Sequence, residues 1–333
     1  MAENRGKSVL DEFGLIDRYF RPLATDAHAF GLADDAAVLL QEPGSDIVLS
    51  SDMVCAGIHF FPDDPPSAIA RKALRVNVSD IVAKGARPFA YTLSIALPEG
   101  TTGAWLAGFT GGLRGDQDQY GLTLLGGDTT RSAGGLAVSI TAFGRVDAGG
   151  MVRRAGGSPG DGIYVSGTIG DSAIGLMVRQ GEVEAADIGR GARSLEARYL
   201  VPDPPAALVP ALRDNASAAL DVSDGLWADL GHMCSASGVT ADVDAGRVPL
   251  SDAVQRLVAR RPEMLMKALT GGDDYQVLAA IPPERSEGFE NAAASAGVQV
   301  SRIGTLVAGQ GAPTMTLHGE ALSPVGALGH THF

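Results

Sequence analysis

The chain has 333 residues, 45% of them hydrophobic and 5% aromatic, and its 26 basic and 39 acidic side chains leave a formal charge of −13. This length predicts two domains, each large enough to bury its own core. The negative charge and the lack of a Lys/Arg-rich run argue against nucleic-acid binding, and no apolar stretch approaches the roughly 18 residues of a membrane span. Two widely spaced cysteines, Cys55 and Cys234, and an N-terminus without a signal-peptide core predict a soluble cytoplasmic protein.

In chain order, the first half alternates helical and strand patterns. Apolar periodicity predicts helices and β-branched apolar runs predict strands. The expected elements are a helix at 8–22, strands at 35–40 and 46–54, a helix at 67–86, a strand at 89–98, a helix at 101–121, and strands at 122–128 and 135–146. This alternation predicts a sheet with helices packed against it.

A stretch rich in glycine, with proline and serine, at 147–162 predicts the junction between two domains, 1–148 and 149–333. The second half continues with alternating elements, except for a charged stretch that we interpret as a connector. The expected order is a strand at 162–169, a helix near 171–181, the connector at 182–198, a proline-rich turn at 201–205, a helix at 205–213, a strand and turn at 219–225, a helix at 227–237, and a further strand–helix series.

Aspartates recur in five short segments, each at the apparent end of a strand or in a turn or helix. The segments contain Asp34 and Asp35; Ser50, Ser51 and Asp52; Asn77 and Asp80; Gly127 and Asp128; and Asp221, Ser223 and Asp224. Mg²⁺ prefers carboxylate and hydroxyl oxygens together with water and phosphate oxygens, so such segments suit a site for a metal-bound nucleotide. Taken singly, an aspartate in a turn is more often a helix cap or part of an Asx-turn.

Asp80 is an exception, because it falls within an otherwise apolar helical run. A buried carboxylate without a partner is costly, so the sequence predicts an inward partner for this side chain.

The common nucleotide-binding motifs are absent from the sequence. The Gly-Lys-Ser at residues 6–8 lacks the first glycine of a P-loop and no strand precedes it. With few lysines, phosphate binding would depend on metals and on arginines such as Arg131 and Arg154, although either can equally be a plain surface arginine. His59 can orient an anionic substrate or be a half-buried core histidine.

The motifs together resemble the thiamine-monophosphate kinase family. They are, in order, DDA at 34–36, SDMVCAGIHF at 51–60, KALRVNVSDIVAKGARP at 72–88, GGDTTR at 126–131, RAGGSPGD at 154–161, GDSAIGL at 170–176, DVSDGLWADL at 221–230 and GGDDY at 271–275. The resemblance implies a two-domain α+β fold of the aminoimidazole ribonucleotide synthetase-like type. Its N-terminal domain would bind ATP and Mg²⁺ and carry a mixed sheet that pairs across a homodimer, and its C-terminal α/β domain would complete the nucleotide and substrate site.

The same resemblance implies the residues of the site. Several Mg²⁺ ions would be held by Asp35, Ser50, Ser51, Asp52, Asp80, Asp128, Asp221 and Asp224; ATP would contact Gly127, Asp128, Arg154 and Ser223; and the substrate would contact His59, Asp273 and His330. Two substrate positions depart from the family pattern. Asp273 stands where a glutamate is usual, and His330 where a stacking tyrosine is expected.

The reaction implied is transfer of a phosphoryl group from ATP to thiamine monophosphate, giving thiamine diphosphate. The acceptor phosphate is already mostly ionised at neutral pH, since its second pKa is about 6, so we assign no catalytic base. Two alternatives stay open. One is another ATP-dependent enzyme of the same superfamily, such as an aminoimidazole ribonucleotide synthetase, and the other is a non-catalytic nucleotide-binding dimer.

Overall fold

The structure is a computed structural model that describes residues 12–323. These residues form two compact units. Unit 1 contains the chain up to residue 40 together with 51–74 and 89–142, and unit 2 contains 41–50, 75–88 and the chain from 143 onward. Across residues 12–323, no helix combines the length and the apolar character that crossing a bilayer requires.

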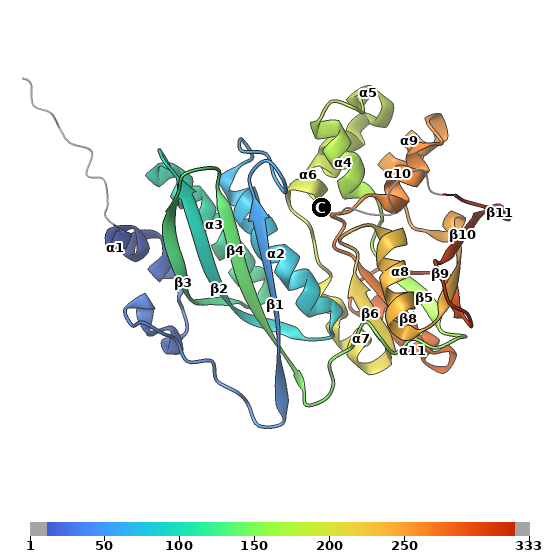
Figure 1. The fold of residues 1–333 in the computed structure, drawn as a ribbon, viewed down its shortest axis with the longest axis horizontal. Coiled ribbons are helices and arrows are strands. Elements are labelled where there is room, and N and C mark those ends of the chain that lie inside the picture. The colour runs from blue at the N-terminus through green and yellow to red at the C-terminus, as the bar shows by residue number, and fades with distance from the viewer. Residues whose placement is uncertain (1–11, 324–333) are drawn as a thin grey trace, which may run out of the picture. The chain divides into compact units, whose positions relative to one another are not determined.

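The N-terminal elements form a four-stranded sheet with two long helices along one face (Figure 1). The strands run in the order β1-β4-β2-β3, and β2 and β3 are parallel. The elements are α1 (Glu12–Leu15), the short turns η1 (Ile16–Phe20), η2 (Arg21–Leu23) and η3 (Ala27–Leu32), then β1 (Ser45–Cys55), α2 (Pro66–Ala83), β2 (Arg87–Pro98), α3 (Gly103–Tyr120), β3 (Thr123–Ser132) and β4 (Ala137–Asp147).

Local chemistry fixes the ends and the packing of α3. The Thr102 hydroxyl accepts a hydrogen bond from the Trp105 N–H at 3.2 Å, which caps the first turn. The helix ends at Gly121, whose φ of 68° is left-handed and suits glycine. Gly112 lets α3 approach α2 closely, because a Cβ at this position would lie 2.5 Å from the Ser67 carbonyl oxygen.

The C-terminal elements form a seven-stranded mixed sheet in the order β11-β10-β7-β9-β5-β8-β6. β7 and β10 are parallel, whereas β5, β6, β8 and β9 pair antiparallel. The strands are β5 (Gly162–Ser166), β6 (Ala218–Asp221), β7 (Thr240–Asp244), β8 (Val277–Ile281), β9 (Val300–Val307), β10 (Thr314–Leu317) and β11 (Glu320–Ala321). The helices are α4 (Asp171–Arg179), α5 (Ala185–Ile188), α6 (Ala192–Leu200), α7 (Val209–Asn215), α8 (Leu226–Ser237), α9 (Asp252–Arg260), α10 (Met264–Thr270) and α11 (Ser286–Ser295), with turns η4 (Gly189–Gly191), η5 (Ala206–Leu208), η6 (Ala245–Arg247) and η7 (Pro283–Arg285).

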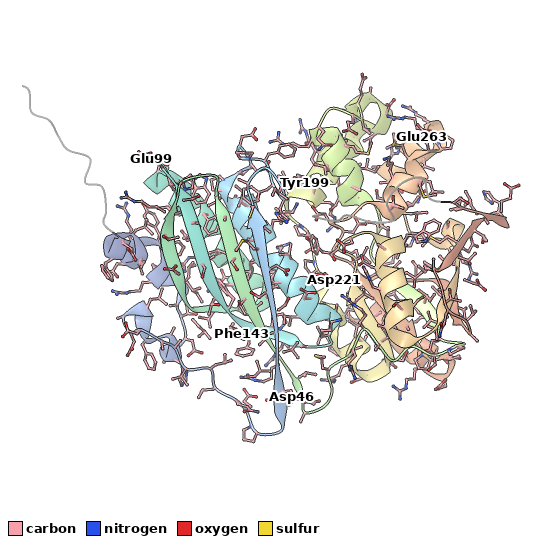
Figure 2. All side chains as sticks on the ribbon, in the orientation of Figure 1. Asp46, Glu99, Phe143, Tyr199, Asp221 and Glu263 are labelled. Carbon is pink, nitrogen blue, oxygen red and sulfur yellow. The ribbon has the colours of Figure 1, made fainter. Side chains whose placement is uncertain are left out.

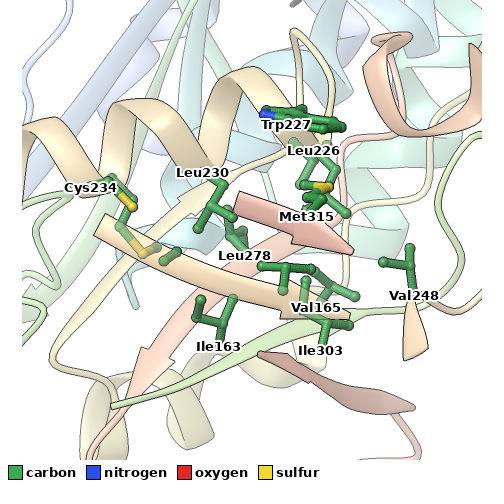
Figure 3. Close-up of a cluster of buried hydrophobic side chains, with 14 of the residues drawn as sticks. Ile163, Val165, Leu226, Trp227, Leu230, Cys234, Val248, Leu278, Ile303 and Met315 are labelled. Carbon is green, nitrogen blue, oxygen red and sulfur yellow. The ribbon is translucent and has the colours of Figure 1, made fainter. Parts of the chain in front are cut away.

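The main core of unit 2 lies between α8 and this sheet (Figure 3). Trp227 and Leu230 of α8 pack with strand residues such as Val165 and Leu278, all of them buried. Burying a large apolar side chain stabilises the fold by about 1.5–3 kcal/mol relative to leaving it exposed. This packing anchors the end of β6 and the turn between β6 and α8, where Asp221, Ser223 and Asp224 of the predicted site lie.

The mixed α/β architecture predicted from the sequence is confirmed, and two local predictions are wrong. Residues 35–40 form no strand; the Val38 N–H instead donates to the His28 carbonyl at 3.0 Å. The stretch 182–198 is not a plain connector, because it contains α5 and most of α6. Over its described part, the first predicted helix is a short α-turn followed by π and 3₁₀ turns. The boundary between residues 148 and 149 stays a prediction.

Candidate functional site

Asp80 lies in the last turns of α2 and has the inward partner that its place in an apolar helix led us to expect. The Ser50 hydroxyl, on β1, donates a hydrogen bond of 2.5 Å to Asp80 Oδ2. Both side chains are half-buried. The bond joins two of the predicted metal ligands, which lie 30 positions apart in the sequence.

Asp221 is the last residue of β6 and is buried, with 7% of its surface exposed (Figure 2). The Ser79 hydroxyl of α2 donates a hydrogen bond of 2.8 Å to Asp221 Oδ2. Burial, and next the negative charge of Asp80, raise the pKa of Asp221 well above its usual value; the Ser79 bond and the Lys84 charge oppose this shift. Adjacent residues of α2, Ser79 and Asp80, therefore take part in one acidic cluster with the end of β6.

This acidic cluster has a chemistry that fits a hard dication. Two carboxylates, of which Asp80 opposes the ionisation of the buried Asp221, and the serine hydroxyl oxygens bonded to them are the donors that Mg²⁺ prefers. A dication would remove the repulsion that raises the pKa of Asp221. Asp80, Asp221 and Ser50 would hold such an ion, and its charge would neutralise phosphate oxygens.

The turn after β6 is organised by Asp229, a residue to which the sequence gave no role. Its Oδ2 accepts hydrogen bonds from the N–H groups of Ser223, Asp224 and Gly225 at 3.0, 3.0 and 3.1 Å. Burial, and next the charge of Asp224, raise the pKa of Asp229 to about 7. The available signal was an acidic residue in the first turn of a helix that follows a glycine.

Asp224, Asp229 and the exposed His232 bring possible ligand atoms within 4.8 Å of one another. Because Asp229 Oδ2 already accepts three backbone hydrogen bonds, we assign Asp229 to the support of the turn and keep Asp224 as the predicted ligand.

Asp273 lies in a loop that is tied to the same turn. Its N–H donates to the Ser223 carbonyl at 2.8 Å, and the Tyr275 N–H donates to the Val222 carbonyl at 2.8 Å. Asp273 and Tyr275 have φ values of 72° and 51°, which are left-handed and uncommon for residues other than glycine. The Tyr275 hydroxyl also bonds Asp273 Oδ1 at 3.2 Å. This predicted substrate residue is therefore held in a fixed position relative to Ser223 and Val222.

Within unit 1, the predicted ligands lie on strands and loops and face solvent. Ser51 and Asp52 of β1 are exposed, and the Ser51 hydroxyl bonds that of Thr141 at 2.8 Å. Asp128 of β3 and Asp35, in the loop before β1, are exposed as well.

Gly127 precedes Asp128 on β3 with a φ of 154°, and a Cβ there would collide with the Leu93 carbonyl oxygen. Only glycine therefore allows β3 to lie this close to β2 at the predicted nucleotide-binding position.

The remaining predicted residues have mixed surroundings. His59 is half-buried, and its Nδ1 accepts a hydrogen bond from the Cys55 N–H at 3.0 Å, so this nitrogen already has a partner. Arg154 is exposed. His330 lies outside the described residues. Cys55 is half-buried, Cys234 is buried, and both are free thiols.

A hollow of about 630 Å³ in unit 1 lies against α3 and η1. Arg18, Tyr19 and Arg114 line it together with small residues of α3, and none of the predicted site residues does.

Residues 33–146 match the family AIR synthase related protein, N-terminal domain, and residues 158–314 match AIR synthase related protein, C-terminal domain. Over 304 residues the chain is 43% identical to the thiamine-monophosphate kinase of Caulobacter vibrioides, a match that covers 90% of this chain and 85% of that protein. The chain belongs to the thiamine-monophosphate kinase family.

Two solved structures extend the likeness of the chain to the thiamine-monophosphate kinase family. The thiamine-monophosphate kinase from Stenotrophomonas maltophilia K279a has a TM-score of 0.82 and 40% identity, covering 94% of this chain and 98% of that one. The structure of AaThiL complexed with AMPPCP and TMP has a TM-score of 0.76 and 30% identity, covering 97% of each chain. The predicted family and fold are therefore confirmed, whereas the roles of individual site residues stay predictions.

Proposed function

We propose that this chain transfers the γ-phosphoryl group of ATP to thiamine monophosphate, giving ADP and thiamine diphosphate. The observation that carries the proposal is the cluster of Asp80 and Asp221, tied by Ser50 and Ser79, in a member of this family. The complex of AaThiL with AMPPCP, an ATP analogue, and TMP supports the same pair of substrates.

In this reaction a phosphate oxygen of thiamine monophosphate forms a bond to the γ-phosphorus of ATP as the bond from that phosphorus to the β,γ-bridging oxygen breaks. ADP leaves with the electron pair of the broken bond. The acceptor is already ionised at neutral pH, so no side chain has to remove a proton. The protein has to bring two anions together and hold them in line.

We propose that the acidic residues of both units hold several Mg²⁺ ions, which would supply neutralising charge to the phosphates. In unit 2 the proposed ligands are Ser50, Asp80, Asp221 and Asp224, and in unit 1 they are Asp35, Ser51, Asp52 and Asp128. Arg154 is exposed, and its guanidinium suits phosphate oxygens. The backbone at Gly127 and Ser223 would contact ATP.

At the substrate end, we propose that Asp273 and His59 contact thiamine monophosphate. Asp273 is supported by its rigid loop, because two backbone hydrogen bonds join this loop to residues 222 and 223. His330 is proposed from the family resemblance alone.

The test is ADP release, measured in a coupled assay with ATP and Mg²⁺. We expect ADP to be released with thiamine monophosphate and not with thiamine, and thiamine diphosphate to accumulate in equal amount. Binding of ATP and Mg²⁺ by calorimetry, with no ADP released in the presence of thiamine monophosphate, would instead identify a non-catalytic nucleotide-binding protein. Turnover only with a different phosphorylated acceptor would identify another activity of the superfamily.

We also propose that the chain forms a homodimer through β1. β1 is an edge strand of the four-stranded sheet, and it exposes 63% of Leu49 and 58% of Met53. An apolar edge strand facing water is a ready template for pairing with a second copy. Light scattering coupled to gel filtration should show a dimer, which Leu49→Lys with Met53→Lys should convert to a monomer. Met151→Lys, at an exposed apolar residue outside β1, is the control.

A location in the cytoplasm is proposed with the activity. The free thiols of Cys55 and Cys234 are typical of a reducing compartment.

A further inference from the structure

Lys84 is fixed beside the acidic cluster of Asp80 and Asp221. It follows the last residue of α2, one helical turn after Asp80, and its N–H donates to the Asp80 carbonyl at 3.2 Å. Residues four apart on a helical turn lie on the same face. Lys84 Nζ donates a hydrogen bond of 2.8 Å to the carbonyl of Ala219, two residues before Asp221 on β6. The side chain of Lys84 is thus bonded to β6, which carries Asp221. Its backbone directly follows α2, which carries Asp80.

The backbone of Lys84 is tied down as well. Its carbonyl accepts a hydrogen bond from the Val152 N–H at 3.0 Å, and the next residue, Gly85, has a left-handed φ of 67°. A Cβ at Gly85 would lie 3.1 Å from the Val152 side chain, which leaves little room for the turn to shift. The backbone of Lys84 therefore has a fixed position at the end of α2.

The charges around Lys84 match this geometry. Burial lowers the pKa of the Lys84 ammonium, the Asp221 and Asp80 carboxylates oppose that shift, and Arg154 adds to it. The effect is mutual: the Asp221 carboxylate opposes the fall in the pKa of Lys84, and Lys84 opposes the rise in the pKa of Asp221. The cluster therefore includes the amino group of a lysine that is bonded to β6 two residues before Asp221 and follows Asp80 by one helical turn.

We propose that Lys84 is a positioning residue of the dication site: its bond to the Ala219 carbonyl holds the end of α2, which carries Asp80, against β6, which carries Asp221, and its charge weakens the binding of a free dication there. This inference rests on the proposed function, because it assumes that Asp80 and Asp221 hold a dication. Its consequence is that a dication alone binds weakly, whereas a dication that arrives with the nucleotide phosphates is retained by their negative charge as well.

The experiment measures binding of Mn²⁺ alone to the full chain by electron paramagnetic resonance, without nucleotide. Lys84→Met removes the charge and keeps the length of the side chain, and Lys84→Gln removes the charge and keeps a donor for the Ala219 carbonyl. We expect both variants to bind Mn²⁺ on the order of tenfold more tightly, because a unit positive charge next to the site no longer repels the ion. Lys84→Arg keeps the charge and should stay within about threefold of the unmodified chain.

Unchanged or weaker Mn²⁺ binding in both neutral variants, with unfolding still cooperative, would overturn the inference, because a purely structural lysine can only loosen the site when it is removed. Asp80→Asn distinguishes failure of the inference from failure of the proposed site. If the unmodified chain binds Mn²⁺ and Asp80→Asn lowers the number of bound ions, the site stands and the neutral Lys84 variants alone decide. If Asp80→Asn leaves binding unchanged, the proposed site falls and the inference falls with it.

Discussion

The acidic side chains of the two units are held in different ways. In unit 2, Asp221, Asp229 and Asp274 are buried, with 7%, 3% and 5% of their surfaces exposed, and each accepts hydrogen bonds from hydroxyls or backbone N–H groups of the same unit. In unit 1, Asp35 and Asp128 are exposed. The buried carboxylates have fixed positions before any ligand arrives, and their pKa values are raised by burial.

Buried and exposed carboxylates affect the stability and the geometry of a charged site differently. Burying like charges destabilises the ionised form, but it fixes the geometry that a metal or phosphate requires. Exposed carboxylates cost little stability, because water still solvates them. We therefore expect substitutions in unit 2 to change both stability and activity, and substitutions in unit 1 to change activity alone.

The largest effect is expected on activity, for ligands of either unit. Asp80→Asn and Asp52→Asn each remove a proposed ligand, and each should lower turnover on the order of a hundredfold or more, since even residues that only support a metal ligand contribute about 10- to 100-fold. Circular dichroism should show an intact fold for both. Near-normal turnover in both variants, measured by ADP release, would refute the metal assignment.

The second effect is on the pH dependence of stability. Burial raises the pKa of Asp274 to about 8, against a usual value of 3.8, although N–H groups of Gly170 and Ser172 bond its carboxylate. Between these values the folded chain keeps a proton that the unfolded chain has lost. The contribution of Asp274 to the free energy of unfolding is therefore full below about pH 4 and is lost as the pH rises towards 8, by up to about 1.4 kcal/mol per pH unit.

Asp274→Asn should remove this contribution. The free energy of unfolding, measured with urea between pH 5 and 8, should then vary less steeply with pH, by the slope that corresponds to about one proton. The amide oxygen of asparagine can replace only one of the two carboxylate oxygens that accept from Gly170 and Ser172, so some stability is lost at every pH and only the slope against pH is compared. Asp252→Asn, at an exposed carboxylate of α9, is the control and should leave the slope unchanged. An equal slope for the unmodified chain and Asp274→Asn would show that this carboxyl is ionised in the fold.

A smaller effect is expected on the stability of the metal-free protein. Asp221→Asn removes a buried charge next to Asp80 and keeps an oxygen for the Ser79 hydroxyl, so the free energy of unfolding at pH 8 should rise by about 1 kcal/mol. Turnover should fall at the same time. Urea unfolding in the presence of a chelator measures the change, and a loss of stability would mean that the charge of Asp221 is compensated within the fold.

The smallest effect completes the comparison between the units. Asp128→Asn, at an exposed residue of β3, should change the free energy of unfolding by less than about 0.5 kcal/mol. Its turnover should fall nevertheless. A loss of stability well above this limit would show that the exposed acids of unit 1 also have structural partners, and the contrast with unit 2 would no longer hold.

Much of the fold follows from local patterns in the sequence. The predicted helix at 67–86 and strand at 89–98 correspond to α2 and β2, because long runs of periodic or β-branched apolar residues favour one structure strongly. The ordered motifs identified the family. Weak patterns led to two kinds of error: a predicted strand that does not form, and a helix that was not predicted. Val38 and Leu40 are apolar yet 45% and 51% exposed, and no strand forms there. α6 was hidden by its charged residues, although Ala192, Leu195 and Tyr199 are buried at helical spacing.

By itself the sequence determined which residue types are available to the site: serines and aspartates placed at the ends of strands and helices. Only the tertiary structure decided which of them meet. Ser79 and Asp221 are 142 positions apart and Ser50 and Asp80 are 30 apart, and each pair is joined by a hydrogen bond. Such bonds depend on how α2 packs against β1 and β6, and packing is a property of the whole buried core that no local pattern contains.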